Sequence, residues 1–202
     1  NMFEGLVKRI FKDVRNIDYT EPVARMSWEE AMWTYGNDKP DIRFRMELTN
    51  VKLPSHTFPG RSQLTSLVSE ASFPVFDQAE TIVAMSVPGC SEYTRKQTDE
   101  LTDWVKRPQI GMQGLVYIKY NTDGSLKSSV DKFYSAERLK AIAAACKAQV
   151  GDLILILAGP EEKTRKAMSE LRLEMVLVED ARVVLLLGTP GEGVSLDVPY
   201  AE

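Results

Sequence analysis

The feature that most constrains the fold is DLILILAG, residues 152–159, in which six consecutive apolar side chains follow one aspartate. A strand that is apolar at every position has to be covered on both faces. TIVAMSV, residues 81–87, and GLVYIKY, residues 114–120, are further strand candidates with a covered face. The Asp-Gly pair in NTDGS, residues 121–125, favours a hairpin turn, so LKSSVDKF, residues 126–133, is expected to pair back on residues 114–120.

Capping signals place helices around these strands. Ser27 and Glu30 have the spacing of a capping box and Gly36 supplies a stop, which predicts a helix to about Tyr35. Other helices are predicted over the amphipathic residues 3–17, after the caps Thr94 and Ser135, and from Pro160 to about Glu174. From residue 73 the expected order is two strands, a helix, two strands, a helix, a strand and a helix. This order predicts an α+β fold, a mostly antiparallel sheet covered by helices.

The overall composition narrows the class of protein. With 202 residues, 44% of them hydrophobic, the chain can bury a substantial core, and its net charge of −4 argues against a surface devoted to phosphate binding. It has neither an 18-residue apolar run nor a signal peptide, and Cys90 and Cys146 fit no disulfide framework. We therefore expect a cytoplasmic protein with reduced thiols and no membrane segment. Because Asn1 precedes Met2, we also expect a piece of a longer protein or a cloning remnant.

Two motifs could carry chemistry, and both have a simpler explanation. In VVLLLGTPGEGVS, residues 183–195, glycines and Ser195 have the spacing of a phosphate-binding loop, but Val194 stands where that loop needs lysine. A Gly-Pro turn after a strand is the better interpretation. Cys90 precedes a predicted helix, where a thiol pKa falls, yet His56 is the only imidazole and has no evident partner. We therefore predict no catalytic residue, no cofactor-binding residue and no metal site in this chain.

Cations are scattered through the middle of the chain. The clearest pairs are Arg95 with Lys96 and Lys106 with Arg107, near Tyr93, Trp104 and Tyr117. Such residues could contact a sugar-phosphate backbone. A solvated helix face together with strand ends is the interpretation that we favour, because the chain is net negative.

The stretch TYGNDKPDIR, residues 34–43, reads as a turn that ends a helix. Gly36, Asn37, Asp38 and Pro40 are turn residues, and Asp41 or Arg43 can fix the turn through side-chain bonds to the backbone or to each other. The longer run MSWEEAMWTYGNDKPDIRFRMEL closely resembles a signature of bacterial-type aspartyl-tRNA synthetases, T-x-x-E-A followed by Y-G-S-D-K-P-D-x-R and a strand. Only Asn37 departs from its core. The signature residues are Tyr35, Gly36, Asp38, Lys39, Pro40, Asp41 and Arg43.

The resemblance continues in order to about residue 174. FEGLVKRIFKDVRNID resembles the helix after motif 2 of the class II catalytic domain, and VFDQAETIVAMSVPGCSEYTRKQTDEL, GMQGLVYIKYNTDGSLKSSVDKF, VGDLILILAG and MSELRLE resemble the inserted GAD domain. The resemblance implies part of the catalytic core at 1–50, a connection at 51–72, the GAD domain at 73–175 and an atypical tail at 176–202. Residues 52–70 are longer and more polar than the usual connection, and the tail is hypothesised to be lineage-specific or the product of an altered reading frame.

The resemblance also implies what the parent protein does. It would be a homodimeric ligase that uses ATP and Mg²⁺ to attach aspartate to tRNA, with its catalytic motifs outside this segment. The segment alone is therefore expected to be inactive. The alternative is a non-catalytic adaptor that binds tRNA or a protein, related to the GAD domain of a tRNA-dependent amidotransferase subunit.

Overall fold

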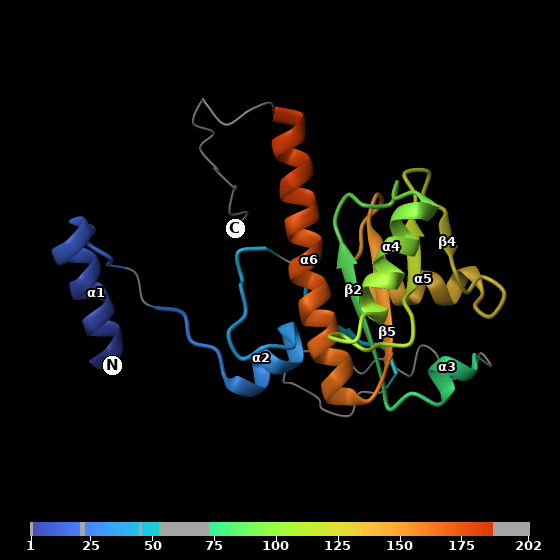
Figure 1. Ribbon diagram of the computed structural model, residues 1–202, viewed down its shortest axis with the longest axis horizontal. Coiled ribbons are helices and arrows are strands. Elements are labelled where there is room, and N and C mark those ends of the chain that lie inside the picture. Colours follow the sequence, from blue (N-terminus) through green and yellow to red (C-terminus); the bar gives the residue numbers. More distant parts are fainter. Residues whose placement is uncertain (1, 21–22, 45, 53–72, 188–202) are drawn as a thin grey trace.

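The computed structural model describes residues 2–20, 23–44, 46–52 and 73–187, with side chains as far as residue 177. Its centre is a five-stranded sheet in the order β1-β2-β5-β3-β4, and every neighbouring pair is antiparallel. The strands are β1 (Thr49–Asn50), β2 (Thr81–Val87), β3 (Val116–Tyr120), β4 (Leu126–Ser128) and β5 (Leu153–Gly159). The α+β prediction is confirmed, with helices on both faces of the sheet (Figure 1).

The uniformly apolar run forms the middle strand, β5. Leu155 lies opposite Met85 of β2 on one side and Tyr117 of β3 on the other. Residues 153–157 are all buried, because alternate side chains enter the core on opposite faces of the sheet. The predicted hairpin is also present, with Ile118 opposite Ser128 and Tyr120 opposite Leu126.

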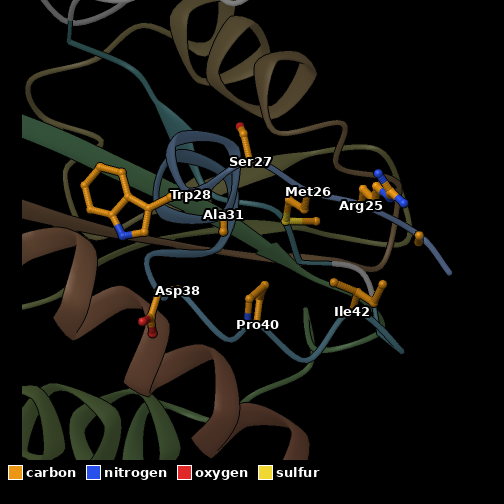
Figure 2. Close-up of a pocket in the computed structure, with 9 residues that line it drawn as sticks. Arg25, Met26, Ser27, Trp28, Ala31, Asp38, Pro40 and Ile42 are labelled. Atoms are coloured by element: carbon orange, nitrogen blue, oxygen red, sulfur yellow. The ribbon is translucent and has the colours of Figure 1, made fainter. Parts of the chain in front are cut away.

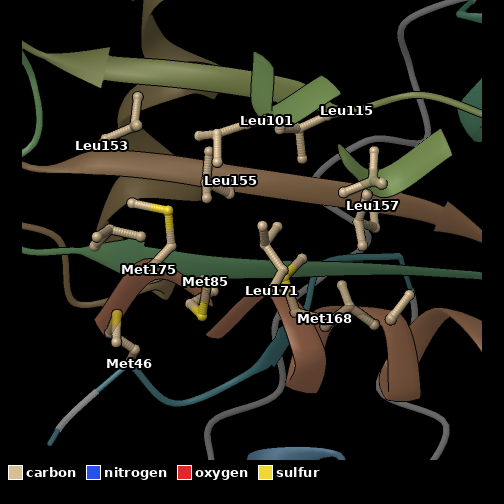
Figure 3. Close-up of a cluster of buried hydrophobic side chains, with 14 of the residues drawn as sticks. Met46, Met85, Leu101, Leu115, Leu153, Leu155, Leu157, Met168, Leu171 and Met175 are labelled. Atoms are coloured by element: carbon tan, nitrogen blue, oxygen red, sulfur yellow. The ribbon is translucent and has the colours of Figure 1, made fainter. Parts of the chain in front are cut away.

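Two hydrophobic cores cover the two faces. On one face the leucines of β5 pack with α4 (Arg95–Lys106) and α6 (Glu161–Leu187), and Figure 3 shows Met168, Leu171 and Met175 beside the sheet. On the other face the isoleucines of β5 pack with α3 (Pro74–Asp77) and α5 (Ala136–Ala145). The helix α6 thus completes one core with its sheet-facing side and leaves its other side for a different partner.

Three helix starts, those of α2, α4 and α5, were predicted to the residue. Ser27 caps α2 (Trp28–Tyr35) by accepting a hydrogen bond from the backbone N–H of Glu30 at 3.0 Å, and Thr94 forms a complete capping box with Gln97. Ser135 likewise caps α5. These caps satisfy backbone donors that the first turn of a helix leaves without intrahelical partners.

Three elements differ from the sequence predictions. The short helix α3 stands where a second strand was expected before β2, since Pro74 is preorganised for a first helical turn and Phe76 is buried below it. The Ala-rich helix after Ser135 was expected over residues 136–149, but α5 ends at Ala145 and Lys147 has a φ of 55°. The helix α6 continues to Leu187 instead of ending near residue 174 because no Gly or Pro interrupts it before residue 188. The strand expected over 183–187 is therefore wrong.

The N-terminal helix α1 (Met2–Arg15) lies away from the sheet (Figure 1). None of its residues is buried, and the apolar stripe predicted from its spacing is open to solvent. The stripe consists of Phe3, Leu6, Val7, Ile10, Phe11 and Val14, each at least 45% exposed. Within the described residues, no helix is both long and apolar enough to cross a membrane.

Candidate functional site

The candidate site is the linker, residues 36–44 and 46–48, together with the side of α6 that holds it. The linker begins at Gly36, whose φ of 71° closes α2 and whose N–H donates to the carbonyl oxygen of Met32. A Cβ atom at this glycine would lie 2.4 Å from the carbonyl oxygen of Arg165. Glycine is therefore required twice here, by the left-handed backbone and by the close approach of α6.

The turn that follows is fixed by short side-chain bonds, as predicted. The Asn37 side-chain oxygen accepts from the N–H of Lys39, and the Asp41 carboxylate accepts from the N–H of Arg43, both at 3.0 Å. A serine hydroxyl can accept the same kind of bond, so the departure at Asn37 preserves the turn. The Arg43 guanidinium also donates to Asp41 at 2.9 Å, and these bonds lower the pKa of Asp41 to about 2.

Arg172 of α6 holds the middle of the linker. Its guanidinium donates to the carbonyl oxygens of Asp41 at 2.7 Å, Phe44 at 2.9 Å and Met46 at 3.1 Å. The guanidinium carbon also lies 4.0 Å from the centroid of the Phe44 ring and 4.8 Å from the centroid of the Tyr35 ring. Arg172 is only 1% exposed, so the carbonyl dipoles and aromatic faces replace the water that this cation has lost.

Arg165 holds the end of α2 in a similar way. Its guanidinium carbon lies 3.4 Å from the Trp33 ring centroid, and one nitrogen donates to the Trp33 carbonyl oxygen at 3.3 Å. Burial lowers the pKa of Arg165 to about 10, and Glu161, 3.6 Å from Nε, opposes that shift. Sequence reasoning missed Arg165 and Arg172. No local pattern marks them, because their partners are backbone carbonyls more than 120 positions earlier in the chain.

A shallow groove of about 440 Å³ lies on the outer side of the linker. Figure 2 shows Met26 on one side of it and Pro40 and Ile42 on the other. Asp38 of the signature also lines the groove, and Trp28 at its edge is 69% exposed. The lining is mixed and open, so it suits contact with another polypeptide surface better than enclosure of a small ligand.

The four cations proposed to contact tRNA do not form one patch. Arg95 and Lys96 begin α4 and lie 3.8 and 3.9 Å from Asp99 and Glu100 of the same helix. Lys106 ends α4, roughly 16 Å away at the usual helical rise, and Arg107 follows it. In the described part of the chain, neither Lys106 nor Arg107 has an ion-pair partner. Arg95 and Lys96 thus lie beside carboxylates of their own helix, whereas Lys106 and Arg107 have no such pair among the described residues.

The thiols offer no nucleophile. Cys90 is 1% exposed in the core, and its sulfur lies 3.4 Å from the carbonyl oxygen of Pro88. Burial raises the pKa of Cys146 to about 12. His56 and the glycine-rich residues 188–195 lie outside the described residues. Across the ranges that the structure describes, no group of three or more His, Cys, Asp or Glu side chains could hold a metal ion.

Comparison with known proteins shows what these elements resemble. Residues 74–168 match the GAD domain. The chain is similar to proteins named aspartate–tRNA ligase from Flavobacterium psychrophilum (46% identity over 175 residues, 87% of this chain), Bacteroides fragilis (49% over 174 residues, 86%) and Parabacteroides distasonis (47% over 176 residues, 87%). It spans 28% of the length of each of these three relatives. Over most of its length the chain is similar to a segment of proteins named aspartate–tRNA ligase, and that segment joins the linker to a GAD domain.

Proposed function

We propose that this chain is the insertion-domain segment of an enzyme that attaches aspartate to tRNA at the expense of ATP. The observation that carries the proposal is the extent of the match. A match of 175 residues in a chain of 202 has to include most of both the linker and the GAD domain. An isolated adaptor module would be expected to match over the GAD domain alone. The corresponding boundaries, 1–50, 51–72, 73–175 and 176–202, are part of this proposal.

In this proposal the segment supports a reaction centre that the rest of the enzyme supplies. Adenylate formation needs cations and Mg²⁺ around the triphosphate. The described residues provide no cluster that would hold the metal, so we assign no catalytic step to them. We expect no aspartate-dependent pyrophosphate exchange from the 202-residue chain and clear exchange from the full-length protein that contains it. Exchange by the isolated chain would refute the assignment.

The open stripe of α1 supports the same proposal. Six large apolar side chains exposed on one helix are unusual for a complete monomer and indicate a surface that another polypeptide covers. We propose that the catalytic core covers it in the full-length enzyme. Homodimer formation and location in the cytoplasm, where translation takes place, follow from the proposed activity and are part of the proposal.

We further propose that Lys106 and Arg107 contact tRNA phosphates, while Arg95 and Lys96 do not. Lys106 and Arg107 have no ion-pair partner among the described residues, whereas Arg95 and Lys96 have carboxylates on their own helix. Changing Lys106 and Arg107 to Gln should reduce the slope of log affinity against log salt concentration by roughly 0.7 to 0.9 per lost contact. The matched change of Arg95 and Lys96 should leave the slope unchanged. Equal slopes for both variants would contradict the assignment.

The same residues keep a second function open, a tRNA-binding adaptor without catalysis. The two functions differ in one measurement. An adaptor would bind tRNA as the isolated chain, with an affinity that falls steeply as salt rises. If the full-length protein charges tRNA and the isolated chain does not bind it at low salt, the adaptor hypothesis is excluded.

A further inference from the structure

One side of α6 forms a continuous contact with α2 and the linker. Arg165, Ser169 and Arg172 are spaced four and three residues apart and therefore lie on one stripe of the helix. A Cβ atom at Gly36 would be 2.4 Å from the Arg165 carbonyl oxygen and 3.1 Å from Cβ of Ser169. The end of α2 thus contacts α6 at van der Waals distance, and the linker continues along the same stripe toward Arg172.

The contact at Arg172 gathers three backbone carbonyl oxygens of the linker. Three carbonyl oxygens within six residues converge on one buried guanidinium, and none of them belongs to a helix or strand. Met46, one of the three, has a φ of 84°, a conformation that side chains other than glycine rarely adopt. The guanidinium reaches these carbonyl oxygens from two separate nitrogens, Nε toward Met46 and Nη2 toward Asp41 and Phe44, whereas an apolar side chain would leave all three without a donor. The linker conformation therefore depends on this one side chain.

We propose that Arg172 is a positioning residue that latches the linker onto α6 and so fixes the orientation of the insertion domain relative to the polypeptide that precedes it. The inference rests on the proposed function for its consequence in catalysis, because the preceding polypeptide would be the catalytic core. Its structural content stands on the contacts alone. The signature around residues 35–43 then has a stated role, to present backbone carbonyls to a cation from the insertion domain.

Substitution of Arg172 should have different effects if the residue holds the linker and if it only stabilises the core. If Arg172 only stabilises the core, its loss should weaken the sheet and the linker together. If it is a latch, the linker should open while the sheet remains closed. Two amides report on these events: the N–H of Leu48 donates to the Thr34 carbonyl oxygen at the end of the linker, and the N–H of Val51 donates to Ile82 in the sheet.

The first experiment is hydrogen exchange on the 202-residue chain, comparing Arg172→Met with the unmodified protein. We expect exchange at Leu48 to accelerate at least about tenfold more than exchange at Val51, since removal of one buried charged hydrogen-bond partner shifts a local equilibrium by that order. Arg138→Met, on α5 across the sheet, is the control and should leave the exchange rates of both Leu48 and Val51 unchanged. Equal acceleration at Leu48 and Val51 would overturn the proposal.

Two further variants, Arg172→Lys and Arg172→Ala, keep the test decisive if Arg172→Met does not fold. Arg172→Lys keeps the charge and the aliphatic stem but has one nitrogen for three carbonyls, so Leu48 should show an intermediate acceleration. Methylguanidinium at low millimolar concentration should restore protection of Leu48 in Arg172→Ala, with sodium chloride at equal ionic strength as the control. Full protection in the lysine variant would contradict the need for a planar fork and overturn the proposal.

The second experiment uses the full-length protein. Arg172→Met should reduce the rate of tRNA charging severalfold more than the rate of pyrophosphate exchange, because only charging requires the insertion domain and tRNA to be aligned with the core. Equal reductions would refute the positioning role. If the unmodified full-length protein shows neither activity, the proposed function fails, while the exchange experiment still decides on the latch.

Discussion

Replacement of Gly36 by Ala tests the contact between α2 and α6 directly. The φ of 71° costs an alanine about 1–2 kcal/mol. The new methyl group would also lie 2.4 Å from a backbone carbonyl oxygen, and relief of such overpacking by moving the two helices apart costs about 1–3 kcal/mol. In a chain of this size each kcal/mol lowers Tm by about 2–4 °C, so a loss of about 3 kcal/mol corresponds to roughly 6–12 °C.

The chain offers a matched control at Gly89. This glycine has the same φ of 71°, but a Cβ atom there would meet nothing within 4 Å. Gly89→Ala should therefore lose only the backbone part, about 1–2 kcal/mol. The assay is urea unfolding of both variants followed by circular dichroism, with the difference between them giving the steric part. Equal losses of stability would refute the close packing of Gly36 on α6.

Three other predictions concern pH, thiol reactivity and association. The pKa of Asp41 is depressed from 3.8 to about 2, so its contribution to stability is fully present above about pH 4 and is lost as pH falls toward 2; Arg43→Met should move this pKa, followed by NMR, back toward 3.8. Cys90 and Cys146 should react with a thiol reagent only after denaturant is added, and reaction in native buffer would contradict their burial. Ile10→Asp should reduce self-association of the isolated chain, measured by gel filtration, and its binding of an apolar dye, measured by fluorescence. Arg9→Asp, on the polar side of α1, should reduce neither.

The parts of the fold that sequence predicted well are those governed by local rules. Ser27, Thr94 and Ser135 start helices where their hydroxyl groups satisfy nearby amides, and the Asp-Gly turn sets the register of its hairpin. The buried strand β5 was recognisable because it is apolar throughout. In each case the side chain and the backbone that it controls are a few residues apart.

The parts that could not be predicted depend on distant contacts. The resemblance implies a strand directly after the signature, but the strand β1 lies at Thr49–Asn50, where β2 is there to pair with it. Phe76 turns a short segment into α3 by entering the core. Arg172 looks in the sequence like any arginine of an amphipathic helix. Its role appears only when the fold brings the linker, 126 residues earlier in the chain, against α6. The signature itself was recognised as a turn fixed by Asp41 or Arg43, but its attachment to α6 was not.

The contact between α6 and the linker also determines how much polypeptide this domain needs. The family match covers residues 74–168, yet Leu48 and Val51 before it and Leu171 and Met175 after it are at most 2% exposed. Burial of each such side chain contributes about 1.5–3 kcal/mol, so the four together contribute about 6–12 kcal/mol, as much as the whole stability of an ordinary domain. Residues 74–168 alone should therefore lack a cooperative unfolding transition, whereas residues 28–187, which keep α2 and the linker, should show one by circular dichroism. Cooperative unfolding of the shorter chain would mean that the linker and the end of α6 are attached to a finished domain. Its absence would mean that both are part of the domain's core.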